Sequence, residues 1–136
     1  MIEAGTEIPS WAVDDVKVEQ MKTMALFLRD PNPIHWDIES VRRLGLGDAV
    51  INQGPTNEAY VINMLIEWLG DPTLLRNLRL RFQANVYAGE RVVAGGTVTE
   101  VNEVDGVRIA NCDVWLRKDD GSDAVRGVAT VELPED

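Results

Sequence analysis

Two residue types that carry much of enzyme chemistry are scarce in this chain, since its 136 residues include one cysteine and one histidine. The single cysteine, Cys112, excludes an internal disulfide and a zinc site built from several cysteines, and we expect no metal. Positive charge is scarce too. Thirteen lysines and arginines stand against 23 aspartates and glutamates, and the formal net charge of −10 repels phosphate backbones. We therefore expect no nucleic-acid partner.

Long apolar runs are missing as well. No stretch approaches the roughly 20 apolar residues that a membrane-spanning helix needs, so we expect no membrane partner. The acidic N-terminus lacks the basic-then-apolar order of a signal peptide, which indicates a cytoplasmic protein. The length fits one domain over residues 1–136 with a real core. Cys112 lies in an apolar strand pattern and is interpreted as a small core residue rather than a nucleophile.

Hydrophobic periodicity divides the chain into a helical first half and a strand-rich second half. After a short edge strand within 7–16, apolar residues recur at helical spacing in 18–28, 38–44 and 56–69. The last of these follows Gly54-Pro55 and is apolar over most of its circumference, which is typical of a buried helix. Alternating patterns then predict strands within 74–83, 92–101, 107–116 and 124–133.

The predicted strands are connected by turn sequences, including Val104-Asp105-Gly106 and Asp119-Asp120-Gly121, and these favour an antiparallel meander. One long antiparallel sheet wrapped around one buried central helix accommodates every segment at once. The sequence therefore predicts the α+β class and a single hot-dog fold.

The stretch from Asp30 to His35 holds the only histidine, with two prolines and Asn32 between the two titratable residues. Proline fixes its own φ, lacks an N–H and pushes the preceding residue toward extended backbone, so this stretch cannot be a regular helix. A stiff loop with one carboxylate and one imidazole can hold two proton-transfer groups around a single water. Taken alone, the stretch is equally compatible with a helix-ending turn that carries a surface histidine.

The sequence around this loop resembles the MaoC-like, R-specific enoyl-CoA hydratases, which have the hot-dog fold. Their hydratase motif has the form D-x-N-P-[IVL]-H-x-D, and Asp30-Pro31-Asn32-Pro33-Ile34-His35-Trp36-Asp37 matches it completely. Gln53-Gly54-Pro55 stands where the family has a His-Gly-Met-like step into its central helix. Residues 81–90 echo the family phrase R-F-x-x-P-V-x-x-G-D. The resemblance thus covers roughly residues 7–133.

The resemblance implies a hydratase or dehydratase that interconverts trans-2-enoyl and (R)-3-hydroxyacyl thioesters of CoA or an acyl-carrier protein. It implies syn addition of water without a cofactor, with Asp30 as base and His35 as its partner. The chemistry itself requires a hydroxide equivalent at C3, a proton at C2 and stabilisation of an enolate-like oxygen. Asp30 and His35 together can orient one water and move its protons. The acyl group stays open.

The third requirement, an oxyanion donor, is assigned to Gly54. A backbone N–H at the start of the buried helix is unpaired within the helix and lies at its positive end. Aimed at the thioester carbonyl, it would stabilise the developing oxyanion. Pro55 has no N–H, so Gly54 or Gln53 has to supply the donor. A simple turn before the helix is compatible with this role.

Further substrate contacts are expected from Asn32, Trp36, Gln53, Arg79 and Arg81. Asn32 is also expected to hold the turn between its two prolines. Trp36 either packs in the core or lines the acyl pocket. The arginines would meet the phosphates of CoA, or else they lie on the solvated face of a strand. Asp37 is expected to cap the helix over 38–44.

Two alternative functions remain open. A hot-dog acyl-CoA thioesterase would use a carboxylate on the central helix, where Glu58 and Glu67 are the only acids. A non-catalytic chain would instead complete the substrate tunnel of a related subunit. Hot-dog sheets normally pair edge to edge, which removes an exposed edge. The resemblance therefore implies a homodimer or higher oligomer with its sites at the interface, and a heteromer with a related hot-dog subunit is also open.

Overall fold

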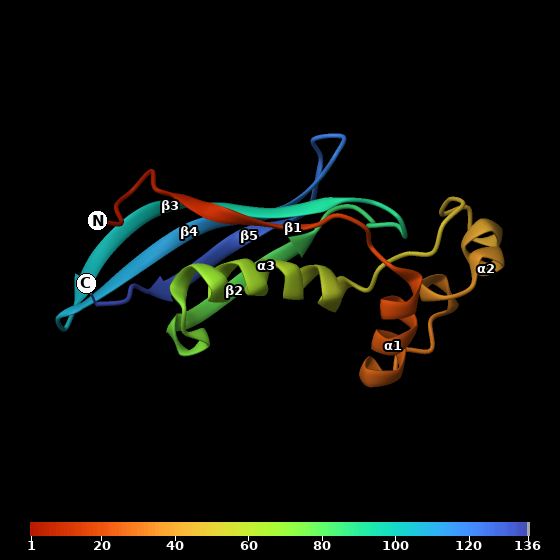
Figure 1. Cartoon of the computed structure of the whole chain (residues 1–136), viewed down its shortest axis with the longest axis horizontal. Helices are drawn as coiled ribbons and strands as arrows, with labels where there is room; N and C mark the ends of the chain where they lie inside the picture. Colours follow the sequence, from red (N-terminus) through yellow and green to blue (C-terminus); the bar gives the residue numbers. More distant parts are fainter. Residues whose placement is uncertain (136) are drawn as a thin grey trace.

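The structure, a computed structural model, describes residues 1–135 as one five-stranded antiparallel sheet with a long helix along one face (Figure 1). The strands are β1 (Glu7–Val13), β2 (Leu75–Phe82), β3 (Val92–Val104), β4 (Val107–Lys118) and β5 (Asp123–Glu132). The helices are α1 (Val18–Leu28), α2 (Ile38–Arg43) and α3 (Gly54–Leu69), with short 3₁₀ turns η1 (Pro33–His35) and η2 (Pro72–Leu74). The predicted α+β hot-dog arrangement is confirmed.

The order of strands across the sheet is β1-β3-β4-β5-β2. The meander predicted for the second half of the chain therefore holds for β3, β4 and β5 but not for β2, which pairs with β5 at the far edge. Segment 83–91 between β2 and β3 is longer than a hairpin loop, which has two to five residues. This length lets it carry the chain from the edge strand β2 across the sheet to β3. β1 takes the place beside β3.

β2 and β5 approach each other closely at Gly127. A Cβ placed on this residue would lie 1.9 Å from the carbonyl oxygen of Arg79. No side chain fits in that space, so glycine allows the edge strand to pair at this point.

The core lies between α3 and the sheet. α3 buries Val61, Met64 and Leu65 among its apolar residues, as its broad apolar stripe predicts. Cys112 in β4 is 1% exposed, which confirms its assignment to the core. Burial raises the pKa of the Cys112 thiol to about 11, so the thiol stays protonated at neutral pH.

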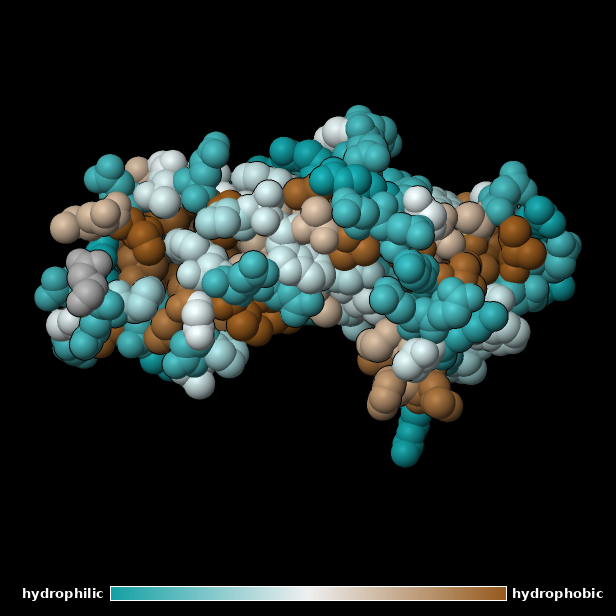
Figure 2. All heavy atoms as spheres, viewed as in Figure 1, coloured by the Kyte–Doolittle hydropathy of each residue, from teal (hydrophilic) through white to brown (hydrophobic). Residues whose placement is uncertain are grey.

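α1, η1 and α2 form a group beyond the end of the sheet at which α3 begins (Figure 1). Apolar atoms gather at the free end of α1 (Figure 2). Leu26 and Phe27 there are 79% and 78% exposed. None of the helices within residues 1–135 combines the length and apolar character needed to cross a bilayer.

Candidate active site

Asp30 is placed by the way in which α1 ends. Arg29 adopts a left-handed conformation with φ of 50°, and the N–H of Asp30 then donates to the carbonyl oxygen of Ala25 at 3.0 Å. This left-handed cap stops the helix and turns the chain into the proline-rich loop. Asp30 therefore sits at a fixed point just beyond the helix, with its side chain 33% exposed.

Asn32 holds the loop in shape, as the sequence predicts. Its N–H donates to Asp30 Oδ1 at 3.0 Å, and its own Oδ1 accepts from the N–H of Ile34 at 3.3 Å. The second bond caps η1, the short turn that carries His35. Asn32 thus fixes the backbone between Asp30 and His35, while a contact of Asn32 with substrate stays a prediction.

His35 and Asp30 are brought into direct contact. His35 Nε2 lies 3.2 Å from Asp30 Oδ2, and the histidine is 7% exposed. His35 Nδ1 lies 2.6 Å from the carbonyl oxygen of Ile51. A carbonyl oxygen can only accept a hydrogen bond, so Nδ1 of His35 carries a hydrogen. In the neutral ring, Nε2 then carries no hydrogen and can act as an acceptor. The Nε2–Oδ2 contact is therefore stable when one proton is shared between the imidazole and the carboxylate.

Asp37, the last residue of the motif, caps α2. Its Oδ1 accepts from the N–H of Glu39 at 3.2 Å, and its Oδ2 accepts from the hydroxyl of Ser40 at 2.6 Å. The hydroxyl of Ser40 holds the pKa of Asp37 below its ordinary value. The predicted capping role is confirmed.

Gly54 is the first residue of α3 and is followed by Pro55. Its N–H finds no acceptor within the part of the chain that the structure describes, as expected at a helix N-terminus. The ring of Phe82, on the edge strand β2, lies 3.5 Å from the position that a Cβ of Gly54 would take. Gly54 therefore presents a free donor beside an aromatic ring.

Two hydrogen bonds of Ile51 join the loop that carries Asp30 and His35 to the segment that leads into α3. Ile51 donates its N–H to the carbonyl oxygen of Ile34 at 2.9 Å, and its own carbonyl accepts from the ring of His35. Ile51 is three positions before Gly54 in the chain. The proposed proton-transfer pair and the proposed oxyanion donor are thus held by one short segment.

A buried polar network lies beside this segment and was missed at the level of sequence. Asn52 Nδ2 donates to Asn57 Oδ1 at 2.8 Å and to the hydroxyl of Tyr60 at 3.2 Å. Burial raises the pKa of Tyr60, so its hydroxyl stays neutral. Asn57 and Tyr60 are three apart on α3, and polar groups at that spacing on an otherwise apolar helix are the signal that could have revealed the network.

An apolar hollow of about 350 Å³ lies between α1 and the first turns of α3. In Figure 2 the outline of the molecule is concave between the protruding α1 and the body that contains α3. The residues that line the hollow are Glu19, Gln20, Thr23, Met24, Thr56 and Tyr60. Thr56 and Tyr60 place this hollow along the first turns of α3, the helix that begins at Gly54.

The other residues predicted to contact substrate lie in different surroundings. Trp36 is 47% exposed, so it is not a core residue. Gln53 is fully buried, and its Nε2 donates to the carbonyl oxygen of Met21 in α1 at 2.7 Å. Arg79 and Arg81 line a hollow with Arg126 on the face of the sheet turned away from α3. Substrate contacts of these residues stay predictions.

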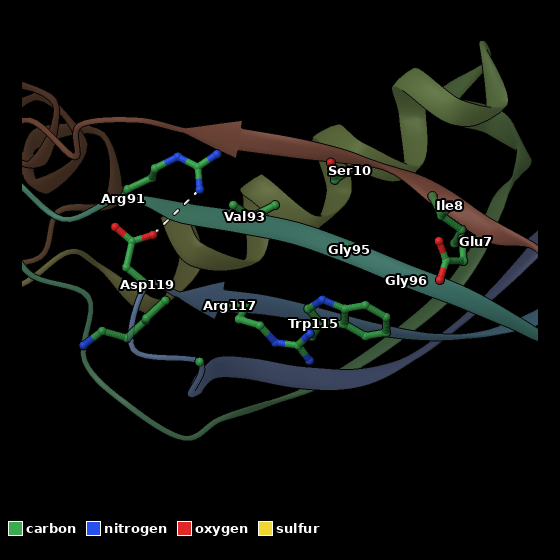
Figure 3. Close-up of a pocket in the computed structure, with 12 residues that line it drawn as sticks. Glu7, Ile8, Ser10, Arg91, Val93, Gly95, Gly96, Trp115, Arg117 and Asp119 are labelled. Atoms are coloured by element: carbon green, nitrogen blue, oxygen red, sulfur yellow. Dashed lines mark ion pairs between the residues drawn. The ribbon is translucent and has the colours of Figure 1, made fainter.

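A second hollow on that outer face, of about 440 Å³, runs along β3 and β4 (Figure 3). Trp115 lies across Gly95 there, with the guanidinium of Arg117 4.9 Å from the centre of its ring. The basic residues of this hollow are paired with acids, for example Arg91 with Asp119 at 3.7 Å. Within residues 1–135, no three His, Cys, Asp or Glu side chains gather as metal ligands.

Comparison with known families identifies the chain. The family model described as "MaoC like domain" matches residues 5–114. This chain belongs to the MaoC-like family. No curated protein matches this MaoC-like chain.

Solved structures share the fold of this MaoC-like chain over nearly its whole length. The (R)-hydratase from A. caviae involved in PHA biosynthesis has a TM-score of 0.85 and 22% identity, with 98% of each chain covered. A chain of the ChsH1-ChsH2 complex from Mycobacterium tuberculosis has a TM-score of 0.83 and 23% identity, covering 98% of this chain and 100% of that one. The unliganded R-hydratase PhaJ1 from Pseudomonas aeruginosa has a TM-score of 0.83 and 19% identity, and the match covers 99% of this chain and 84% of that one. At these identities the likeness concerns the fold.

Proposed function

We propose that this MaoC-like chain is a hydratase or dehydratase that interconverts trans-2-enoyl and (R)-3-hydroxyacyl thioesters. The observation that carries the proposal is the contact of 3.2 Å between His35 Nε2 and Asp30 Oδ2, with the ring of His35 oriented by the hydrogen bond from its Nδ1 to the carbonyl of Ile51. Two fold neighbours, from A. caviae and P. aeruginosa, are described as R-hydratases, which supports the same reaction class.

In the proposed reaction the dyad starts with its shared proton on His35 Nε2 and with Asp30 as the base. Asp30 takes a proton from a bound water as the water oxygen adds to C3, and His35 donates the proton on Nε2 to C2. The proton on Asp30 then returns to Nε2 across their contact of 3.2 Å, which restores the starting state. Because the two groups are adjacent, hydroxyl and proton reach the same face of the double bond, so the addition is syn.

Gly54 stabilises the charge that develops on the thioester oxygen. As water adds at C3, the carbonyl oxygen takes on enolate character, and the free N–H of Gly54 donates to it. The N-terminal end of α3 adds the positive end of the helix dipole at the same place. We assign the apolar part of the substrate to the hollow between α1 and the first turns of α3, whose volume of about 350 Å³ is in the range of ligand pockets.

A thioesterase is the weaker candidate because the Asp30–His35 contact already pairs a carboxylate with an imidazole. Of the two acids of α3, the half-buried Glu58 lies one turn beyond Gly54 and is the one that a thioesterase could use. Glu67 is exposed and lines a hollow with Trp11 and Trp68, on the last turns of α3 and away from Gly54. The Asp30–His35 pair belongs to the group of short elements at the end of the sheet where α3 begins, and Gly54 is the first residue of α3 at that same end. A carboxylate aimed at a thioester bound at Gly54 would therefore come from the dyad or from Glu58 rather than from Glu67, and release of free thiol would point to Glu58.

We further propose that the chain acts as a homodimer or as one subunit of a heteromer. β2 is an edge strand, and Leu26 and Phe27 expose apolar side chains beside the dyad loop. One fold neighbour is a complex of ChsH1 and ChsH2. Light scattering on the purified chain is expected to give a dimer or larger. A stable monomer with full activity would contradict this proposal.

The proposed reaction is tested with the purified chain, crotonyl-CoA and a series of longer and ring-bearing enoyl-CoA substrates. We expect the absorbance of the conjugated thioester to fall without release of free thiol, and chiral analysis to give the (R)-3-hydroxyacyl product. Thiol release without hydration would identify a thioesterase. A chain that changes no substrate, alone or in an oligomer, would refute the catalytic proposal.

A further inference from the structure

α1 leads to Asp30 but is weakly attached to the rest of the chain. Met21 is its one fully buried residue, and Phe27 near its end is 78% exposed. The N–H of Asp30 is bonded to the last turn of this helix through Ala25. A shift of α1 therefore moves the carboxylate of Asp30 relative to the start of α3.

One buried side chain ties α1 to the start of α3. Gln53 Nε2 donates to the carbonyl oxygen of Met21 at 2.7 Å, and Gln53 is fully buried. A carbonyl oxygen has two lone pairs, so it can accept this bond as well as its bond within the helix. Gln53 directly precedes Gly54, and segment 51–54 also holds the ring of His35. This segment therefore connects the dyad, α1 and the proposed oxyanion donor.

Packing alone does not explain a glutamine at this position. Within residues 1–135, the Oε1 of Gln53 has no hydrogen-bond partner although it is buried. An unsatisfied buried acceptor destabilises the folded chain, and an apolar side chain of similar length would avoid the penalty. A buried acceptor of this kind requires a physical reason, and the bond from Gln53 to Met21 offers one.

We propose that Gln53 is a positioning residue that holds α1, and with it Asp30, in register with Gly54. The kinetic part of this inference rests on the proposed hydratase function. The structural part, that the Gln53–Met21 bond restrains α1, does not depend on any activity.

Gln53→Met separates restraint from packing, since methionine has a similar length and leaves no polar atom unpaired. We expect the melting temperature to stay at or above that of the parent. Amide hydrogen exchange in residues 18–28 should become at least about tenfold faster, while α3 and the sheet keep their protection. Unchanged exchange in 18–28 would overturn the inference, whether or not the chain is an active hydratase.

The kinetic test uses crotonyl-CoA. In Gln53→Met we expect kcat to fall about 10- to 100-fold, because a misplacement of about 1 Å can cost 100-fold, with KM within about threefold of the parent. Gln53→His offers a ring N–H and should recover part of the loss. In an Asp30→Asn background, Gln53→Met should cause no further loss, because the group that it positions is gone. Independent, multiplying losses would overturn the inference.

Val98→Ala is the matched control, because it removes buried methyl groups of β3 and leaves the site untouched. It should lower the melting temperature and keep kcat per folded molecule. A fall in kcat equal to that of Gln53→Met would indicate general loosening and would overturn the positioning role. If the parent hydrates no enoyl thioester, the proposed function fails, and hydrogen exchange alone decides the role of Gln53.

Discussion

Replacing Gly54 by proline removes the proposed oxyanion donor without breaking a hydrogen bond within residues 1–135. The N–H of Gly54 has no acceptor in the described chain, so its loss breaks no bond within the fold. Gln53, which would precede the new proline, already has φ of −66° and ψ of 141°, the extended conformation that a residue before proline requires. Proline is also well tolerated in the first turn of a helix.

Gly54→Ala is the matched variant, because it keeps the N–H. Its Cβ would meet the ring of Phe82 at 3.5 Å, an ordinary contact. Alanine and proline at this position both place a Cβ in the helical region before Pro55, which is sterically disfavoured, so the two variants share that penalty. The difference between them reports the loss of the donor together with the ring carbon that replaces its hydrogen.

Loss of one oxyanion donor lowers kcat by about 100- to 1,000-fold, or roughly 2.7–4 kcal/mol of transition-state stabilisation. With crotonyl-CoA as substrate, we expect Gly54→Pro to fall by this factor below Gly54→Ala, with similar melting temperatures for the two. Equal kcat values in two folded variants would refute the role of Gly54. A large loss in Gly54→Ala alone would indicate steric blocking instead.

Three further predictions concern the fold. Gly127→Ala should lower the free energy of unfolding by about 3 kcal/mol in a denaturant titration, because its Cβ meets the carbonyl of Arg79 at 1.9 Å; a neutral effect would contradict the close pairing of β2 with β5. At Asp123, burial alone would raise the pKa, but hydrogen bonds from two arginines bring it below the model-compound value of 3.8. The stabilisation from Asp123 is thus present above that value and is lost as the pH falls through the lowered pKa of the folded chain. Asp123→Asn should therefore lower the free energy of unfolding at pH 7 by about 1–2 kcal/mol and make it less dependent on acid. Identical acid-unfolding curves for the parent and the variant would refute the pairing of Asp123 with Arg117 and Arg126. Cys112, with a pKa of about 11, should resist thiol reagents at pH 8 until the chain unfolds, and rapid labelling of the folded chain would show that it is not in the core.

Local signals in the sequence were strong enough to predict most elements. α1 spans Val18–Leu28, as its apolar spacing indicates, and Asp37 caps α2 as its position before that helix suggests. The prolines around Asn32 correctly exclude a regular α-helix, and the chain forms a short 3₁₀ turn there instead. These features depend on neighbours within a few residues, which a single sequence contains.

Long-range partners were not predictable in the same way. The bond from His35 to Ile51 spans 16 residues and that from Gln53 to Met21 spans 32, and no periodicity encodes either pair. The place of β2 beside β5 depends on how segment 83–91 crosses the sheet, and it puts Arg79 on the outer face. The residues of the motif were thus visible in the sequence, but the contacts that orient them required the fold.

The most direct measurement is the rate at which crotonyl-CoA loses its conjugated-thioester absorbance with the parent, Asp30→Asn and His35→Ala chains, compared at equal folded concentration. Asn is isosteric with Asp and can still accept the N–H of Asn32, so the loop that carries His35 should persist. If Asp30 and His35 move the protons of one water, the parent hydrates the substrate and each variant is slower by about 100- to 10,000-fold. Hydration within about threefold of the parent in both variants would contradict the assignment of the dyad.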